Sequence, residues 1–304
     1  MIIGVNGQDG SLLAENLLAR GRRVIGVGRC PEPTPPTSVD FSYLRLDLRD
    51  EHALADALMR YKPSRIFHLA AVHGPDGAPL ETQWADALRV NVMSLQACLE
   101  HARLCGESVR VIYASSSRIF GTPLRGRLDE DSPYAPTDLY GVTKKMACDL
   151  IALYRTRHGA DAAAIHFFNH DSDRRPSTYF SPKLTAAVAA ALHNQEAAPI
   201  RSLDFHCDWG DAAEYMDLVA RFSEADAVAD CILATGRTWS GQELAEAVFR
   251  RFDLDWRDYL DAPRGPAREA PFTADVSTFE RMADARPRRS ILDVCDDLIR
   301  KRIA

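Results

Sequence analysis

Short apolar runs rich in β-branched residues alternate with longer amphipathic stretches over the first half of the chain. The amphipathic stretches predict helices at Ser11–Ala19, Glu51–Tyr61, Ala85–Leu104 and Tyr140–His158. The apolar runs predict strands at Met1–Val5, Arg23–Val27, Tyr43–Leu46, Arg65–Leu69, Val109–Ala114 and Ala162–Phe168. Repeated strand–helix units form parallel sheets with helices on both faces. The predicted fold class is therefore α/β, a Rossmann-like doubly wound parallel sheet.

The alternation weakens after Asn169, where 171–182 and 261–271 have irregular, loop-rich sequence. One later apolar run, Ala229–Thr235, predicts a strand that returns to the first sheet. We therefore expect a Rossmann domain in residues 1–170, with 213–236 returning to it. Residues 171–212 and 237–304 are expected to form a smaller C-terminal α/β lobe. The segments Pro31–Pro36 and Thr122–Pro136 are expected to be loops.

The composition is typical of a globular protein: of 304 residues, 46% are hydrophobic and 26% charged. The net charge of −6 argues against general binding to nucleic acid or to an anionic membrane. The small basic cluster Arg286, Arg288 and Arg289 is interpreted as a solvated or subunit-facing patch.

Seven cysteines without a Cys-x-x-Cys pair indicate reduced thiols, and the nine histidines have no metal-ligand spacing. We expect no metal. The N-terminus begins with an apolar strand rather than a basic leader, and no apolar run is long enough to span a bilayer. The predicted location is the cytoplasm.

A glycine-rich turn follows the first predicted strand and leads directly into a helix. Glycine lets the backbone approach a pyrophosphate, and the helix N-terminus offers amides and a positive dipole to it. A purely structural turn is the alternative, but the strand, turn and helix together predict dinucleotide binding. The residues expected to bind the cofactor here are Gly4, Gly7, Gln8, Asp9 and Gly10.

The second and third strands end at candidate cofactor residues. Arg29 follows the second strand, where a guanidinium pairs with the 2′-phosphate of NADP and a carboxylate would bind the ribose of NAD. NADP is therefore the expected cofactor, with NAD as the alternative. Asp47 and Leu48 follow the third strand and are expected to bracket the adenine.

The run Ser115-Ser116-Ser117-Arg118 and the later pair Tyr140 and Lys144 form a candidate proton-transfer site. A Tyr and a Lys four residues apart lie one turn apart on a helix, so the ammonium can favour the ionised phenol. By itself this spacing occurs by chance in many helices. The order of the motifs around it is what points to chemistry.

Four segments of the chain resemble an extended short-chain dehydrogenase/reductase, and within that superfamily the GDP-mannose 4,6-dehydratase family. They are Gly4 to Glu15, Phe168-Asn169-His170 with Arg174-Arg175, Asp208-Trp209-Gly210, and Ile232 to Gly236. The resemblance implies a Rossmann domain for cofactor, a substrate lobe, and a homodimer or homotetramer acting on a nucleotide sugar.

The resemblance also assigns roles to residues. It implies that Tyr140 exchanges a proton with a sugar hydroxyl while hydride passes to or from the nicotinamide. Ser116 would bond the same oxygen, and Lys144, with the cationic nicotinamide, would lower the tyrosine pKa. Implied cofactor residues are Leu69, Ala70, Ala71, Tyr140 and Lys144. The implied substrate residues are Asn169, His170 and Lys183. Ser117, Arg118 and Arg268 are further candidates from this sequence itself; Arg118 would either meet a negative group on the sugar or turn outward to pair with an Asp or Glu.

Two residues depart from the family pattern. Dehydratases of this family carry a Glu at position 118 that acts on sugar carbons 5 and 6, whereas Arg118 stays protonated and cannot be that base. Cys207 stands where the family has an Arg for the substrate diphosphate, so Arg201 or Arg268 would have to replace it.

Three hypotheses follow. The leading one is an NADP-dependent oxidoreductase acting at carbon 4 of a nucleotide-activated, GDP-linked sugar, as a 4-keto-sugar reductase or a 4-epimerase in carbohydrate biosynthesis. The second is a 4,6-dehydratase in which another carboxylate, such as Glu130, replaces the lost Glu. The third is an NADP-binding pseudoenzyme, against which the retained Tyr140 and Lys144 argue.

Overall fold

A seven-stranded, all-parallel sheet forms the centre of the larger domain. The computed structural model describes residues 1–35, 38–73, 80–105, 109–193, 195, 199–200, 202–262 and 271–303. The strand order is β10-β7-β5-β4-β1-β2-β3, which confirms the predicted α/β class. The strands are β1 (Ile2–Ile3), β2 (Val24–Gly28), β3 (Phe41–Arg45), β4 (Arg65–His68), β5 (Arg110–Ser116), β7 (Ala162–Phe167) and β10 (Cys231–Leu233).

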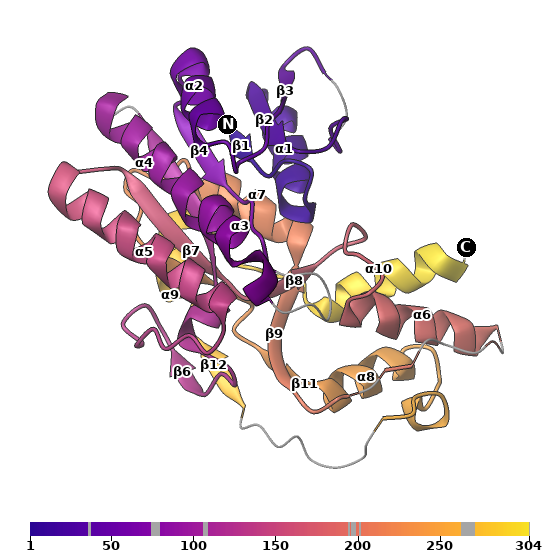
Figure 1. Cartoon of the computed structure of the whole chain (residues 1–304). Coiled ribbons are helices and arrows are strands. Elements are labelled where there is room, and N and C mark those ends of the chain that lie inside the picture. Colours follow the sequence, from indigo (N-terminus) through magenta and orange to yellow (C-terminus); the bar gives the residue numbers. More distant parts are fainter. Residues whose placement is uncertain are drawn as a thin grey trace.

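Helices cover both faces of this sheet (Figure 1). One apolar cluster packs α2 (Glu51–Tyr61), α4 (Ser94–Cys105) and α5 (Leu139–His158) against one face. A second cluster packs α1 (Gln8–Ala19), α7 (Ala212–Phe222) and α9 (Ser277–Ala283) against the other. Because strands between two helical layers are buried on both sides, they read as continuous apolar runs, which is why the sequence located them.

The long helix expected at Ala85–Leu104 is interrupted. A 3-10 turn (η1, Leu80–Gln83) leads into α3 (Trp84–Leu88), and a π-helical turn (η2, Arg89–Met93) separates it from α4. The buried side chain of Asn91 lies in this turn and donates to Val72 O and Thr143 Oγ1, both at 2.9 Å. A π turn often marks a functional site, and hydrophobic periodicity alone does not reveal it.

A second, smaller sheet, β11-β9-β8, has its own apolar core. A further parallel pair, β6 with β12, includes residues of the expected loop 122–136. None of the described helices is long and apolar enough to cross a membrane. The remaining elements are β6 (Gly126–Leu128), β8 (Asn169–Asp171), β9 (His206–Asp211), β11 (Thr238–Ser240), β12 (Phe272–Ala274), α6 (Phe180–Leu192), α8 (Gly241–Arg250), α10 (Ile291–Ile303), η3 (Ser117–Phe120) and η4 (Trp256–Asp258).

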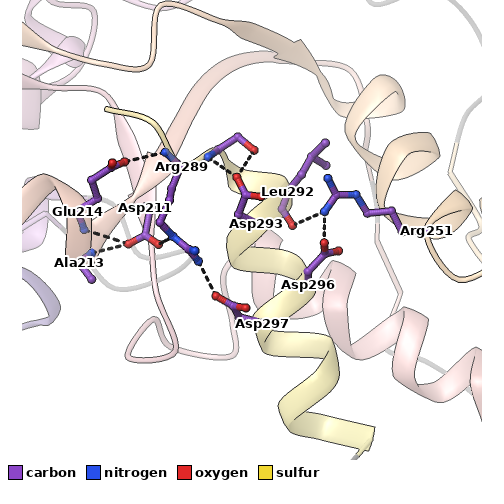
Figure 2. Close-up of polar contacts among 10 residues, drawn as sticks. Asp211, Ala213, Glu214, Arg251, Arg289, Leu292, Asp293, Asp296 and Asp297 are labelled. Atoms are coloured by element: carbon purple, nitrogen blue, oxygen red, sulfur yellow. Dashed lines mark hydrogen bonds and ion pairs between the residues drawn. The ribbon is translucent and has the colours of Figure 1, made fainter. Parts of the chain in front are cut away.

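A polar network joins the start of α7 to the start of α10 (Figure 2). Asp211 caps α7, and its second oxygen accepts from Arg289 Nε at 2.6 Å. Glu214 accepts from the backbone amides of Arg288 and Arg289. Arg289 also pairs with Asp297 on α10. Arg286, Arg288 and Arg289 are all exposed, in keeping with the interpretation of a solvated patch, and the guanidinium of Arg289 also binds carboxylates of its own chain.

Candidate functional site

A cavity of about 910 Å³ lies along the carboxyl ends of the parallel strands. This is the edge of a doubly wound sheet at which such folds bind their ligands. Arg175 and Tyr179, from the loop after β8, complete its wall. The residues proposed from sequence that line it are Gly4, Gly7, Gln8, Asp9, Gly10, Arg29, Leu48, Leu69, Ala70, Ala71, Ser116, Arg118, Tyr140, Lys144, Asn169 and His170.

The glycine turn has the geometry that a dinucleotide requires. Gly4 has φ +92°, and a Cβ there would lie 2.7 Å from the backbone nitrogen of Ala70. A Cβ on Gly10 would lie 2.2 Å from Gly4 O. Gly7 caps α1 without a side chain, so the first amides of the helix face the cavity rather than a capping group. These residues fit the pyrophosphate of NAD(P).

Arg29 and Leu48 lie on the cavity wall, but Asp47 does not. The Asp47 carboxylate pairs instead with Arg49 at 2.5 Å, which holds the Asp47 pKa at about 2. It lines a separate, shallower hollow with Arg49, Asp50 and His52. The structure therefore offers Leu48 as an adenine contact, whereas the side chain of Asp47 turns toward its near neighbour in sequence.

Ser116, Tyr140 and Lys144 come together where β5 ends and α5 begins. The Lys144 Nζ donates to Ala114 O at 2.6 Å and lies 5.4 Å from the centre of the Tyr140 ring. It also lies 4.5 Å from the ring centre of the buried Tyr113, a cation–π contact. Sequence reasoning missed Tyr113, since it reads as an ordinary apolar strand position.

Burial dominates the acid–base properties of Tyr140 and Lys144. Burial raises the pKa of Tyr140, as does the Asp9 carboxylate, while a hydrogen bond with Ser116 and the charge of Arg118 oppose the rise. Burial lowers the pKa of Lys144 to about 7. At neutral pH the Lys144 amine therefore carries only part of a charge. Both shifts come mainly from burial, and the expectation that Lys144 and a bound cationic nicotinamide together lower the Tyr140 pKa stays a prediction.

The family motifs around Gln8 and His170 form one interlocking network. His170 Nε2 lies 3.0 Å from Asp9 Oδ2, and its Nδ1 lies 2.7 Å from Phe168 O. Gln8 donates to His170 O and accepts from Ser172. Burial would lower the His170 pKa, but the Asp9 carboxylate raises it above its ordinary value. His170 therefore reaches the cavity wall with both imidazole nitrogens already engaged.

Arg118 lies on the cavity wall in an ion pair. Its Nη2 lies 2.6 Å from Asp138 Oδ2. Asp138 is the N-cap of α5, and its other oxygen accepts from the amide of Gly141. Sequence reasoning missed Asp138 as a site residue, although an Asp directly before the first residue of a helix is a common N-cap signal. The cation therefore stands beside Tyr140 with a partner from the same helix.

Several proposed residues lie elsewhere. In the ranges that the structure describes, Ser117 and Lys183 do not line the cavity, and neither does Cys207. Arg201 and Arg268 lie outside the described residues. Glu130 accepts from Ile232 N at 3.1 Å and from Thr278, so it supports β10 and α9 rather than the cavity.

Fold and site together define a class, that of NAD(P)-dependent nucleotide-sugar-modifying enzymes of the extended short-chain dehydrogenase/reductase type. The model of the family described as "GDP-mannose 4,6 dehydratase" matches residues 1–288. The chain belongs to this family.

Individual relatives agree with this assignment. The chain is 31% identical over 265 residues to GDP-mannose 4,6 dehydratase 2 of Caenorhabditis elegans, covering 82% of this chain and 69% of that protein. It is 30% identical over 301 residues to GDP-mannose 4,6-dehydratase of Vibrio cholerae, covering 91% of this chain and 80% of that protein. Among solved structures, MoeE5 in complex with UDP-glucose and NAD superposes with a TM-score of 0.80 at 25% identity, covering 100% and 99%.

Proposed function

We propose that the protein is an NADP-dependent oxidoreductase acting at carbon 4 of a GDP-linked sugar, as a 4-keto-sugar reductase or a 4-epimerase. The observation that supports it most is the meeting of Ser116, Tyr140 and Lys144 on one cavity wall, with Arg118 beside them in place of a catalytic carboxylate. The relatives' names support a GDP-linked substrate.

The residues on the cavity wall can carry out a proton transfer. A bound NAD(P) would supply the hydride acceptor or donor. Because burial raises its pKa, Tyr140 holds its proton at neutral pH and can give it to a keto oxygen. Ser116 hydrogen-bonds the Tyr140 side chain and would share that oxygen. Lys144 is held by Ala114 O under the tyrosine ring. The reducing direction therefore follows most directly from these residues.

The dehydratase alternative needs a carboxylate at the sugar. Asp9 is paired with His170 and Asp138 with Arg118, which leaves Glu81 as the remaining acidic residue on the described cavity wall.

Under the proposed function, purified protein should oxidise NADPH with a GDP-4-keto-hexose, or exchange the carbon-4 configuration while retaining its cofactor. Mass spectrometry after incubation with GDP-mannose and NADP is the deciding measurement, since a product lighter by one water would overturn the proposal.

Arg29 is proposed to select NADP. Its exposed side chain lies on the cavity wall at the end of β2. Arg29→Glu removes a hydrogen-bond donor to the 2′-phosphate and places a negative charge beside it. The affinity for NADP should therefore fall roughly 10- to 100-fold, while the affinity for NAD is kept. Protein fluorescence quenching measures both. Arg23→Glu, at the opposite end of β2, is the matched control, and an equal loss for the two cofactors would contradict the assignment.

We further propose a homodimer or homotetramer. Met146 and Leu153 are 39% and 42% exposed, and they lie seven residues apart on one face of α5. Exposed apolar side chains in such an arrangement favour association. Light scattering is expected to give at least twice the mass of one chain, and a strictly monomeric protein at all concentrations would argue against it.

A further inference from the structure

Arg118 is fixed in place by its surroundings, although its side chain is 49% exposed. Arg118 lies in the 3-10 turn η3, and its backbone amide donates to Ser116 Oγ at 3.3 Å. The start of α5 packs directly on it, because a Cβ on Gly141 would lie 2.6 Å from Arg118 O. These contacts fix the backbone of Arg118 relative to Ser116 and the start of α5, and the residue lines the cavity beside Tyr140.

The Arg118 guanidinium retains binding capacity. It offers five N–H donors, and Asp138 Oδ2 is its one ion-pair partner within the described ranges. Asp138 cannot swing away without giving up the amide of Gly141, which its other oxygen accepts at 2.7 Å. Asp138 therefore orients the guanidinium, while the remaining donors are available to a second, planar anion in the cavity.

The other charged groups of the cavity do not offer the same site. Arg175 pairs with the fully buried Asp171 and lies over the Tyr179 ring at 4.3 Å. Lys144 is buried beneath Tyr140 and is engaged by Ala114 O. Arg29 follows the end of β2, in the part of the cavity where the dinucleotide is expected. Arg118 is thus the half-exposed cation of the described cavity wall whose charge acts on Tyr140.

This argument rests on the function proposed above, in which carbon 4 is the reacting carbon. The ring neighbours of carbon 4 are carbon 3, which carries a hydroxyl, and carbon 5, which carries carbon 6. We propose that Arg118 binds a carboxylate at carbon 6, so that the substrate is a nucleotide-activated uronic acid rather than a neutral hexose. The nucleotide and the carbon-4 chemistry stay as proposed; the inference adds the charge of the sugar.

Selective binding of acidic sugars tests this proposal. Calorimetric titration of the NADP-saturated protein would compare GDP-mannuronate with GDP-mannose, and UDP-glucuronate with UDP-glucose. We expect the acid of at least one pair to bind roughly 10- to 100-fold more tightly than its neutral partner, the range for a hydrogen bond to a charged group. Arg118→Gln should remove this preference, because it weakens binding of the acid far more than binding of the neutral sugar. Arg118→Lys should keep part of it.

Arg127→Gln is the matched control, because Arg127 is an exposed arginine paired with Asp275 outside the cavity wall. Circular dichroism shows whether each variant folds, and the wild-type preference is informative without any variant. Equal or weaker binding of both acids, or a preference that survives in Arg118→Gln, overturns the proposal. Turnover of a neutral 4-keto-hexose with NADPH in that case leaves the proposed function standing, whereas failure of both pairs and of all turnover removes both.

Discussion

Tyr140→Phe should reduce turnover about 10³-fold, within the range for loss of a general acid or base. Phenylalanine keeps the ring that lies 5.4 Å from the Lys144 ammonium and 6.4 Å, edge to face, from His73. It removes only the hydroxyl that bonds with Ser116 and would protonate the sugar oxygen. The loss should therefore appear in kcat, while the affinity for NADP stays near the wild-type value.

The control for this prediction is Tyr259→Phe, which removes a hydroxyl from a tyrosine that is 42% exposed and does not line the described cavity wall. Its steady-state kinetics should match wild type. If Tyr140→Phe turns over every substrate at the wild-type rate, Tyr140 is not the proton donor and the pseudoenzyme hypothesis gains support. A large loss of NADP affinity would instead indicate that the hydroxyl serves the cofactor.

The sequence predicted the central fold well because its strands, apart from the edge strand β3, are largely buried. The predicted Arg65–Leu69 and Ala162–Phe168 differ from β4 and β7 by one residue at their ends. Helix α2 has the predicted bounds, since the Asp50 side chain caps its first turn and Lys62, in the left-handed region, ends it. In each of these elements a local signal coincides with the tertiary environment.

Where prediction failed, the determining contact came from distant residues. The break at Arg89–Met93 follows from Asn91 reaching Val72 and Thr143, and β6 exists because β12, more than a hundred residues later, pairs with it. The pair of Asp47 and Arg49 is the exception, since it is local, but hydrophobic periodicity does not show which charged side chains pair. The ion pair of Arg118 with Asp138 likewise depends on how η3 meets α5, which a list of motifs does not specify.

His170→Gln should lower the free energy of unfolding by about 3 kcal/mol at pH 5.5. This is the lower end of the range for removing one partner of a buried ion pair, and it applies because Asp9 is partly exposed. Burial alone would lower the His170 pKa, yet Asp9 raises it, and Arg175 opposes the rise. Burial alone would raise the Asp9 pKa, yet His170 lowers it. The pair joins α1, which packs on the seven-stranded sheet, to β8 of the three-stranded sheet, so its loss should loosen the contact between them.

The sign of the pH dependence follows from these shifts. A raised histidine pKa stabilises the fold fully below the ordinary value of 6.5, and this contribution is lost as the pH rises through the higher pKa of the folded state. A lowered carboxyl pKa stabilises above the ordinary 3.8 and is lost as the pH falls through the lower folded value. Both contributions are present between those two ordinary values, so the stability difference between wild type and His170→Gln should be largest there.

Chemical denaturation of wild type and His170→Gln between pH 5 and 9 provides the measurement. The difference should shrink steadily above pH 6.5, and adding Asp9→Asn to His170→Gln should cost little more than His170→Gln alone. Lys145→Gln is the control, since Lys145 and Asp149 form an exposed pair that should contribute less than about 1 kcal/mol at every pH. A difference that is the same at pH 5.5 and pH 9 would show that His170 is neutral in the folded protein. The link between Asp9 and His170 would then be an ordinary hydrogen bond rather than an ion pair.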